Sequence, residues 1–255
     1  CLLRRQRQMC IRDSYNSYFK PNNTYIVVVG DVNFKDIKKL IKKRFGNWEV
    51  SNTLEKTIPT AKANVSNTEI NFVDMPNAVQ SNISLTSNVE FSMSDDDYHA
   101  VLIANKILGG GFNSYLNMNL REEHGYTYGA RSSIGASRYR VSRFTASTAV
   151  RNMVTDSAVI EIVKEINKIR DTFVDEEKLK NAKAKYVGDF VLALERPSTI
   201  AGYALDVIYN NLPDNFYENY LEKINTVTVE DVKRVANTYF SVDNARIIVV
   251  GKGSD

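Results

Sequence analysis

Arg121 and Tyr128 are the residues of this chain whose chemistry best suits a reaction at a peptide carbonyl. An arginine donates through a rigid planar fork, and a tyrosine phenol can donate to an oxygen on which negative charge develops. The surrounding sequence predicts a short helix that ends near Gly125 and a strand that begins near Tyr128. We therefore expect the pair at a junction of helix and strand, where both side chains could hold one carbonyl oxygen.

A run of three glycines precedes the predicted helix and is the third feature of this region. The glycines are Gly109, Gly110 and Gly111. They allow backbone conformations that other residues avoid, and Asn113 or Ser114 is expected to cap the helix. Leu116 and Leu120 stand four residues apart and give the helix one apolar stripe. Two interpretations stay open for the glycines, contact with substrate or a tight exit from the preceding helix.

The arginine and the tyrosine also have an ordinary structural interpretation. A helix arginine often pairs with a nearby carboxylate, and Glu122 and Glu123 follow Arg121 directly. Tyrosines in strands are common at the edge of a core, where the ring is buried and the hydroxyl is wet. Spacing alone favours this structural interpretation of the pair.

The sequence shows few of the motifs that bind a metal or activate a nucleophile. The chain has two histidines, His99 and His124, and neither has a second histidine four residues away, as a zinc-binding helix of the H-x-x-E-H type requires. Leu120 stands where the first ligand of such a motif would precede His124. The glycine run lacks the context of a phosphate-binding loop, and no G-x-S-x-G motif is present. We therefore expect no zinc or other cofactor to be bound by this chain.

Composition places the chain among water-soluble globular proteins and leaves its compartment open. Hydrophobic residues make up 43% and charged residues 25% of the 255 residues. No apolar run approaches the ~20 residues of a membrane span. Acidic and basic residues are balanced outside the N-terminal segment, which argues against a nucleic-acid-binding module.

The first fourteen residues stand apart from the rest of the sequence. Four arginines and one aspartate in this segment account for the whole net charge of +3, and both cysteines, Cys1 and Cys10, lie here. A basic arm that binds nucleic acid or an anionic membrane is one interpretation. The segment shows no clear hydrophobic period, so we expect residues 1–14 to be a non-native or disordered leader and exclude them from the fold.

Periodicity along the remaining chain predicts both strands and helices. Strands are predicted at 25–29, 69–74, 80–87, 128–134, 143–150 and 245–250. Helices are predicted after the Asn33 cap, after the Asp95–Asp97 cap, and at 154–171, 176–193, 196–210, 214–223 and 229–240. The segment 244–251 echoes the segment 23–30, which indicates a domain repeated once with only the tail of its first copy.

The glycine–arginine–tyrosine region resembles the second, zinc-free domain of the pitrilysin/insulinase family of zinc peptidases. That domain carries L-G-G-G-x-x-S-x-L followed by L-R-E-x-x-G-x-x-Y. The matching positions are Leu108, Gly109, Gly110, Gly111, Ser114, Leu116, Leu120, Arg121, Glu122, Gly125 and Tyr128. The segment from Pro21 to Trp48 is likewise similar to the end of the family's first domain, which reads P-N-N, V-V-V-G-D and F-G-x-W.

The resemblance implies a fold class and a domain organisation. The fold would be α+β, an antiparallel-rich sheet with helices packed on one face, as one full domain plus the tail of a second copy. After the leader at 1–14, residues 15–50 would end the first peptidase-family domain, 51–65 would be a linker, and 66–252 would form the complete second domain.

The resemblance also implies a function, which is the substrate-binding and catalysis-supporting half of a zinc metalloendopeptidase. Two such domains would close as a clamshell around unfolded peptide or a small protein substrate. Arg121 and Tyr128 would support the substrate carbonyl, Gly109, Gly110 and Gly111 would bind substrate, and zinc would lie in an upstream domain or a partner subunit. This chain alone would then be inactive. The alternative is a non-catalytic partner subunit, or a peptide-binding or assembly module, with no part in chemistry.

Overall fold

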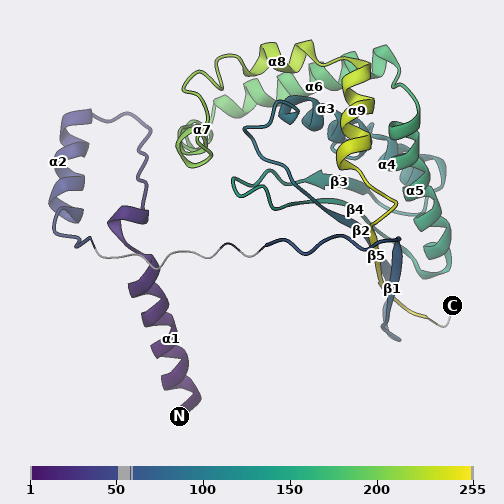
Figure 1. Ribbon diagram of the computed structural model, residues 1–255, viewed down its shortest axis with the longest axis horizontal. Coiled ribbons are helices and arrows are strands. Elements are labelled where there is room, and N and C mark those ends of the chain that lie inside the picture. The colour runs from purple at the N-terminus through teal and green to yellow at the C-terminus, as the bar shows by residue number, and fades with distance from the viewer. Residues whose placement is uncertain (1, 51–57, 59, 254–255) are drawn as a thin grey trace. The chain divides into compact units, whose positions relative to one another are not determined.

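The computed structural model describes residues 2–50, 58 and 60–253 of the chain. The chain divides into two compact units, shown in Figure 1. The first comprises Cys1–Pro59 and Leu194–Ile208, and the second comprises Thr60–Ala193 and Tyr209–Asp255. Most of the domain expected at 66–252 thus belongs to the second unit, while the expected domain boundaries stay a prediction.

The described part of the first unit is helical. It contains α1 (Leu2–Tyr18), the short 3-10 helix η1 (Pro21–Asn23), α2 (Phe34–Phe45) and most of α7 (Pro197–Tyr209). The predicted cap of α2 is confirmed, because the side chain of Asn33 accepts from the backbone N–H groups of Lys35 and Asp36 at 2.9 and 3.4 Å.

Two expectations for the first unit differ from the structure. The strand predicted at 25–29 is wrong, because this segment has no regular secondary structure. A strand needs a hydrogen-bonded neighbour, and the described part of this unit contains no other strand to supply one. Residues 2–14, which were expected to belong to a non-native or disordered leader, are helical, and α1 continues through residue 14 without a break. Its leucine, arginine, glutamine and methionine residues favour a helix even without a hydrophobic period.

Most of the linker expected at 51–65 lies outside the described residues, and 60–65 has no regular secondary structure.

The second unit is built on a five-stranded sheet. Its strands are β1 (Glu69–Asp74), β2 (Gln80–Val89), β3 (Ala130–Ile134), β4 (Ser142–Arg151) and β5 (Arg246–Gly251). They lie in the order β1-β5-β2-β4-β3. Only the β1–β5 pair is parallel, which confirms the expected antiparallel-rich sheet.

The helices of this unit cover one face of the sheet (Figure 1). They are α3 (Tyr98–Leu108), α4 (Tyr115–Asn117), the π-helix η2 (Met118–Glu123), the 3-10 helix η3 (Asn152–Val154), α5 (Thr155–Asp171), α6 (Glu176–Leu194), α8 (Tyr220–Thr226) and α9 (Val229–Tyr239). Side chains along β4 alternate accordingly, with Phe144 and Ala146 buried and Arg143 and Ser147 exposed. The expected α+β fold with helices on one face is therefore confirmed, and the other face is open to solvent.

Two local details of the helices differ from expectation. The helix predicted at 214–223 begins only at Tyr220. Asp97 occupies the cap position of α3, but its carboxylate caps nothing; it accepts from Arg234 at 2.7 Å instead. Asp95 likewise turns back to the backbone N–H of Ser92 at 3.1 Å. Tertiary partners and a local turn thus compete successfully for carboxylates that the sequence assigns to the helix end.

The core lies between the sheet and the helices, and it holds the elements next to the predicted site. Leu116 and Leu120 are fully buried, which confirms the apolar stripe predicted for the short helix. Phe144 of β4 stacks on Phe240 at 4.7 Å between ring centroids and ties the sheet to the end of α9. None of the described helices is both long and apolar enough to cross a membrane.

Candidate functional site

One hollow of the second unit is lined by all five residues that the sequence predicts to form the site. It has a volume of about 630 Å³. Its lining includes Gly109, Gly110, Gly111, Arg121 and Tyr128. These residues come from the end of α3, from η2 and from the segment before β3, so only the tertiary fold brings them to one place.

Arg121 lies on the π-helix η2, immediately after the buried Leu120. Its guanidinium carbon sits 4.6 Å from the centre of the Phe112 ring, and its Nε lies 3.4 Å from a carboxylate oxygen of Glu122. The pairing with Glu122 is the one that the structural interpretation predicts. The side chain is 38% exposed, and within the described chain no hydrogen bond uses its guanidinium. The terminal nitrogens of this arginine are therefore available as donors to a ligand.

Tyr128 stands in solvent and does not fit the structural interpretation of a core-edge tyrosine. It is 92% exposed, and β3 begins two residues after it. The backbone beside it is held firmly, because Thr127 Oγ1 accepts from the N–H of Gly129 at 3.1 Å. The hydroxyl of Thr148 on β4 lies 3.0 Å from Thr127 Oγ1 and 3.1 Å from the Gly129 carbonyl oxygen. A fixed backbone thus presents an unburied phenol at the rim of the hollow.

The turn between Arg121 and Tyr128 ends the helix at Gly125, as the sequence predicts. Gly125 has φ +61°, a left-handed conformation that favours glycine. The N–H of Gly125 bonds to the carbonyl of Arg121 at 3.1 Å, and the N–H of Tyr126 bonds to that of Leu120 at 2.8 Å. This closes the helix and reverses the chain towards β3. The structure records no direct contact between the Arg121 and Tyr128 side chains, which share the hollow.

The glycine run serves close packing rather than unusual backbone angles. None of its three residues has a positive φ, which corrects the reason that the sequence suggested. A Cβ on Gly109 would lie 2.2 Å from the backbone nitrogen of Ser132 on β3, whereas a Cβ on Gly111 would meet no atom closer than 3.7 Å. The N–H groups of Gly109 and Gly110 both bond to the Asn105 carbonyl, as in a helix exit. A substrate role for these glycines stays a prediction.

Two buried asparagines position the site, and the sequence interpretation missed both. Asn117 donates to the carbonyl of Phe112 at 2.8 Å and accepts from the N–H of Ala130 at 3.3 Å, which ties the glycine loop to the start of β3. Ser114, which was expected to cap this helix, makes no cap hydrogen bond. The signal that could have revealed Asn117 is a poor helix former three residues before Leu120, and hence on the same buried face of the helix.

Asn119 anchors the π-helix to α5. It donates to Glu161 at 2.7 Å and to the buried Glu165 at 2.8 Å. Burial acts to raise the pKa of Glu161, but the hydrogen bond from Asn119 and the ion pair with Lys164 outweigh it and hold that pKa below its usual value. The ionised carboxylate of Glu161 and the hydrogen bond to Glu165 therefore hold the helix that carries Arg121.

Two further hollows adjoin the first on the open face of the sheet. The larger of these two hollows, of about 680 Å³, shares Tyr128 with the glycine-lined hollow and is also lined by Arg151 of β4. The smaller, of about 430 Å³, shares Arg131 and Ser147 with the glycine-lined hollow. Together the three hollows make a continuous surface along the strands, lined by both polar and apolar side chains, with space for an extended chain.

The histidines do not lie in an arrangement that suits a metal. His99 is buried among aromatic rings, with Tyr220 and Phe216 at 5.0 and 5.7 Å between centroids. His124 lies 3.8 Å from Glu161. Across residues 2–50, 58 and 60–253, no group of three or more His, Cys, Asp or Glu side chains could hold a metal ion. The described residues therefore do not suit a zinc ion, which the resemblance places in an upstream domain or a partner subunit.

Comparison with known proteins gives the chain its relatives. A family model described as the peptidase M16 inactive domain matches residues 11–186, and so reaches into the segment expected to be a leader. The zinc protease PqqE of Helicobacter pylori is 27% identical over 236 residues, which are 90% of this chain and 52% of that protein. The probable inactive metalloprotease YmfF of Bacillus subtilis is 23% identical over 226 residues, 86% of this chain and 50% of that protein. The chain thus spans about half the length of these relatives.

The fold has the same relatives. A crystal structure of a protease from Helicobacter pylori superimposes with a TM-score of 0.81 and 24% sequence identity, over 94% of this chain and 58% of that one. The match of the family model covers well over half of the sequence and includes the glycine run, Arg121 and Tyr128. The chain therefore belongs to the peptidase M16 family of pitrilysin- and insulinase-type proteins, in which it matches the domain described as inactive.

Proposed function

We propose that the second unit is the substrate-holding half of a zinc endopeptidase, and that the zinc is bound outside the described residues of this chain. The observation that carries the proposal is the glycine-lined hollow, where an available guanidinium and an exposed phenol face the same space. A tyrosine at the edge of a core buries most of its ring, and full burial of a Phe-sized side chain is worth about 1.5–3 kcal/mol. Tyr128 is better explained as a residue that meets a ligand.

The proposed roles follow from hydrogen-bond chemistry. Arg121 would grip a backbone carbonyl of the peptide near the cleaved bond, because its fork has donors to spare. Tyr128 would donate its phenol hydrogen to the scissile carbonyl oxygen. Charge builds on that oxygen as the carbonyl carbon is attacked, so this hydrogen bond is stronger in the transition state than in the ground state. The phenol should therefore act on kcat and the arginine on KM.

The test is steady-state kinetics on the active protein that combines this chain with its zinc-bearing domain or subunit. Tyr128→Phe removes only a hydroxyl from an exposed side chain, so the fold should be unchanged while kcat falls by roughly 10²-fold or more. Arg121→Ala should raise KM. The double variant should lose less than the sum of both losses, because the two residues would serve one bound geometry.

Tyr139→Phe is the matched control. It removes a phenol hydroxyl from the turn between β3 and β4, outside the three hollows, and should leave kcat unchanged. Circular dichroism would verify the fold of each variant. Full kcat in Tyr128→Phe would contradict the proposed role.

A non-catalytic partner subunit is the second candidate function. The name of the Bacillus subtilis relative describes that protein as probably inactive, so relatives of both kinds match this chain. In a protein of that kind neither Arg121 nor Tyr128 would affect turnover. The kinetics of Tyr128→Phe therefore decide between the two candidates.

A further inference from the structure

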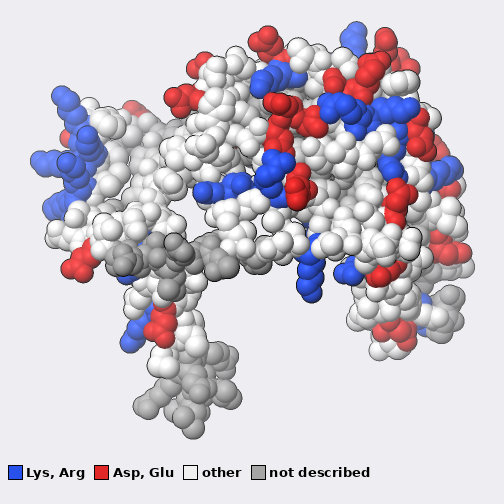
Figure 2. All heavy atoms as spheres, in the orientation of Figure 1, with Lys and Arg blue, Asp and Glu red and all other residues white. Residues whose placement is uncertain are grey.

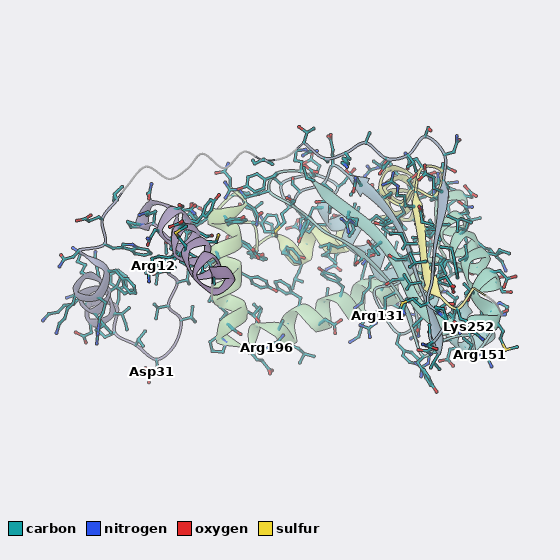
Figure 3. The ribbon with its side chains drawn as sticks, turned by 90° about the horizontal axis from the view of Figure 1, so that it is seen from below. Arg12, Asp31, Arg131, Arg151, Arg196 and Lys252 are labelled. Atoms are coloured by element: carbon teal, nitrogen blue, oxygen red, sulfur yellow. The ribbon has the colours of Figure 1, made fainter. Side chains whose placement is uncertain are left out.

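Besides Arg246 of β5, which pairs with Glu69 of β1 at 3.4 Å, three arginines project from the open face of the sheet, opposite the helices. They are Arg131 on β3 and Arg143 and Arg151 on β4, and all three are exposed. Arg131 pairs in register with Ser147, midway between the two arginines of β4. Figure 3 labels Arg131 and Arg151, which come from these neighbouring strands. The three side chains therefore form a row that follows the strand direction.

The arginines of this row lack the carboxylate partners that arginines of the helical side have. On that side, Arg170 pairs with Asp243 at 2.7 Å and Arg234 pairs with Asp97 at 2.7 Å. Figure 2 shows acidic and basic side chains interspersed over the helices. Within the described residues, no carboxylate lies within ion-pair distance of Arg131, Arg143 or Arg151.

The hollows on this face carry positive charge and no negative charge. Their linings include Arg121, Arg131 and Arg151, and no aspartate or glutamate lines any of the three. The other lining residues of the sheet are mostly serine, threonine, asparagine and alanine, which are small enough to leave the guanidinium groups accessible. An arginine fork matches a carboxylate with two parallel hydrogen bonds. The chemistry of the face therefore favours an anionic occupant.

We propose that this face binds acidic segments of the substrate peptide, in addition to the carbonyl contacts at Arg121 and Tyr128. The proposal rests on the proposed function, because it assumes that a peptide lies along the face. Arg131 lies level with Ser147, which is four residues from Arg151 and four residues from Arg143 along β4. Because a strand rises about 3.4 Å per residue, neighbouring arginines of the row are separated by roughly 14 Å along the strand. An extended peptide along the strands meets an arginine about every fourth residue. The preferred substrate segment is thus extended, with glutamate or aspartate at about that spacing.

Binding of two labelled peptides to the 255-residue chain, followed by fluorescence anisotropy, tests this. One unstructured peptide carries glutamate at every fourth position, and the other carries glutamine there. The glutamate peptide should bind more tightly, and the preference should weaken as salt is raised. Arg131→Gln and Arg151→Gln should each reduce the preference for the glutamate peptide roughly two- to fivefold, as for the loss of an exposed ion pair. Arg131→Lys should keep part of it, because the charge remains and the fork is lost.

Lys180→Gln is the control, since it removes one positive charge from an exposed position on α6, away from the sheet. It should leave the preference for the glutamate peptide intact. Equal binding of both peptides to the wild-type chain would overturn the charge preference and leave the proposed function standing. Unchanged affinity of the Arg131→Gln/Arg151→Gln variant for the glutamate peptide would overturn the assignment to these residues. Failure of both peptides to bind would contradict the proposed function and this inference with it.

Discussion

At the scale of single residues, the two candidate side chains differ in how far their surroundings explain them. Arg121 has the partner that a structural arginine would have, because Glu122 lies beside its Nε and Phe112 lies under its guanidinium. Tyr128 has neither burial nor a contact that would account for a tyrosine at its position. A bound ligand would therefore explain more about Tyr128 than about Arg121, and Tyr128→Phe is the sharper test of function.

The buried His99 makes the stability of the second unit depend on pH. Burial, reinforced by the positive charge of Lys223, lowers the pKa of His99 to about 4. The rings of Tyr98, Phe216 and Tyr220 enclose the imidazole and offer no opposite charge. Between about pH 4 and pH 6.5 the unfolded chain therefore binds a proton that the folded chain does not. The free energy of unfolding should fall as pH is lowered through this window.

Urea unfolding at pH 7 and pH 5 measures the contribution of His99. The wild-type chain should lose on the order of 1 kcal/mol more than His99→Phe between these two pH values. His99→Phe keeps an aromatic ring in the cluster, and any pH-independent cost of the substitution cancels in the comparison. His124→Gln, at the histidine beside Glu161, is the control and should lose as much unfolding free energy between pH 7 and pH 5 as the wild-type chain. An identical pH dependence in wild type and His99→Phe would show that His99 is not the responsible group.

At the scale of elements, the site depends on how α3, η2 and β3 are joined. The glycine run lets β3 approach the end of α3, where the N–H of Ser132 bonds to the carbonyl of Gly109 at 3.2 Å. Asn117 bonds both the loop and β3. Turns of π-helix, such as the one that carries Arg121, occur frequently at functional sites. The junction is rigid by packing and hydrogen bonding, while its two functional side chains stay exposed.

Alanine substitutions in the glycine run should separate packing from any other role. Gly109→Ala would place a methyl group 2.2 Å from the backbone of Ser132, so we expect a loss of about 1–3 kcal/mol as the strand moves away. Gly111→Ala adds the same methyl group at ordinary van der Waals distance, 3.7 Å from its nearest neighbour, and should change stability little. Thermal unfolding of the two variants makes the comparison. Equal melting temperatures would show that the packing of Gly109 against β3 is not tight.

At the scale of the whole molecule, the chain consists of two compact units and spans about half the length of its curated relatives. The second unit contains the sheet, the three hollows and both candidate side chains. The sheet buries one face under its helices and leaves the other open. That open face is where a second domain or subunit could enclose a peptide, as the proposed function requires.

Removal of residues 1–13 should leave the melting temperature unchanged. The described side chains of α1 before residue 14, from Met9 onward, are all exposed, so deletion removes no buried contact of theirs. Differential scanning calorimetry of the shortened and full chains would measure this. A drop of more than about 2–4 °C, which corresponds to roughly 1 kcal/mol at this size, would show that the segment packs against the rest of the chain.

The sequence by itself determined the fold class and most elements of the second unit. Alternation in β2 and β4 and helical spacing in α5, α6 and α9 report which face of an element is buried, and burial is what the periodicity of a sequence encodes. The glycine run, Arg121 and Tyr128 could be recognised as a motif because they lie close together in the sequence. The strand predicted at 25–29 failed because a strand also needs a partner, which local sequence does not supply.

Only the tertiary structure decided what surrounds these residues. The contacts of Asn119 with Glu161, of Gly109 with Ser132 and of Asp97 with Arg234 join residues far apart in the chain, so no local pattern foretells them. The exposure of Tyr128 and the unpaired row of arginines on the open face have the same origin. Each depends on which carboxylates and apolar surfaces the fold brings near, because burial and charge pairing are properties of the packed chain.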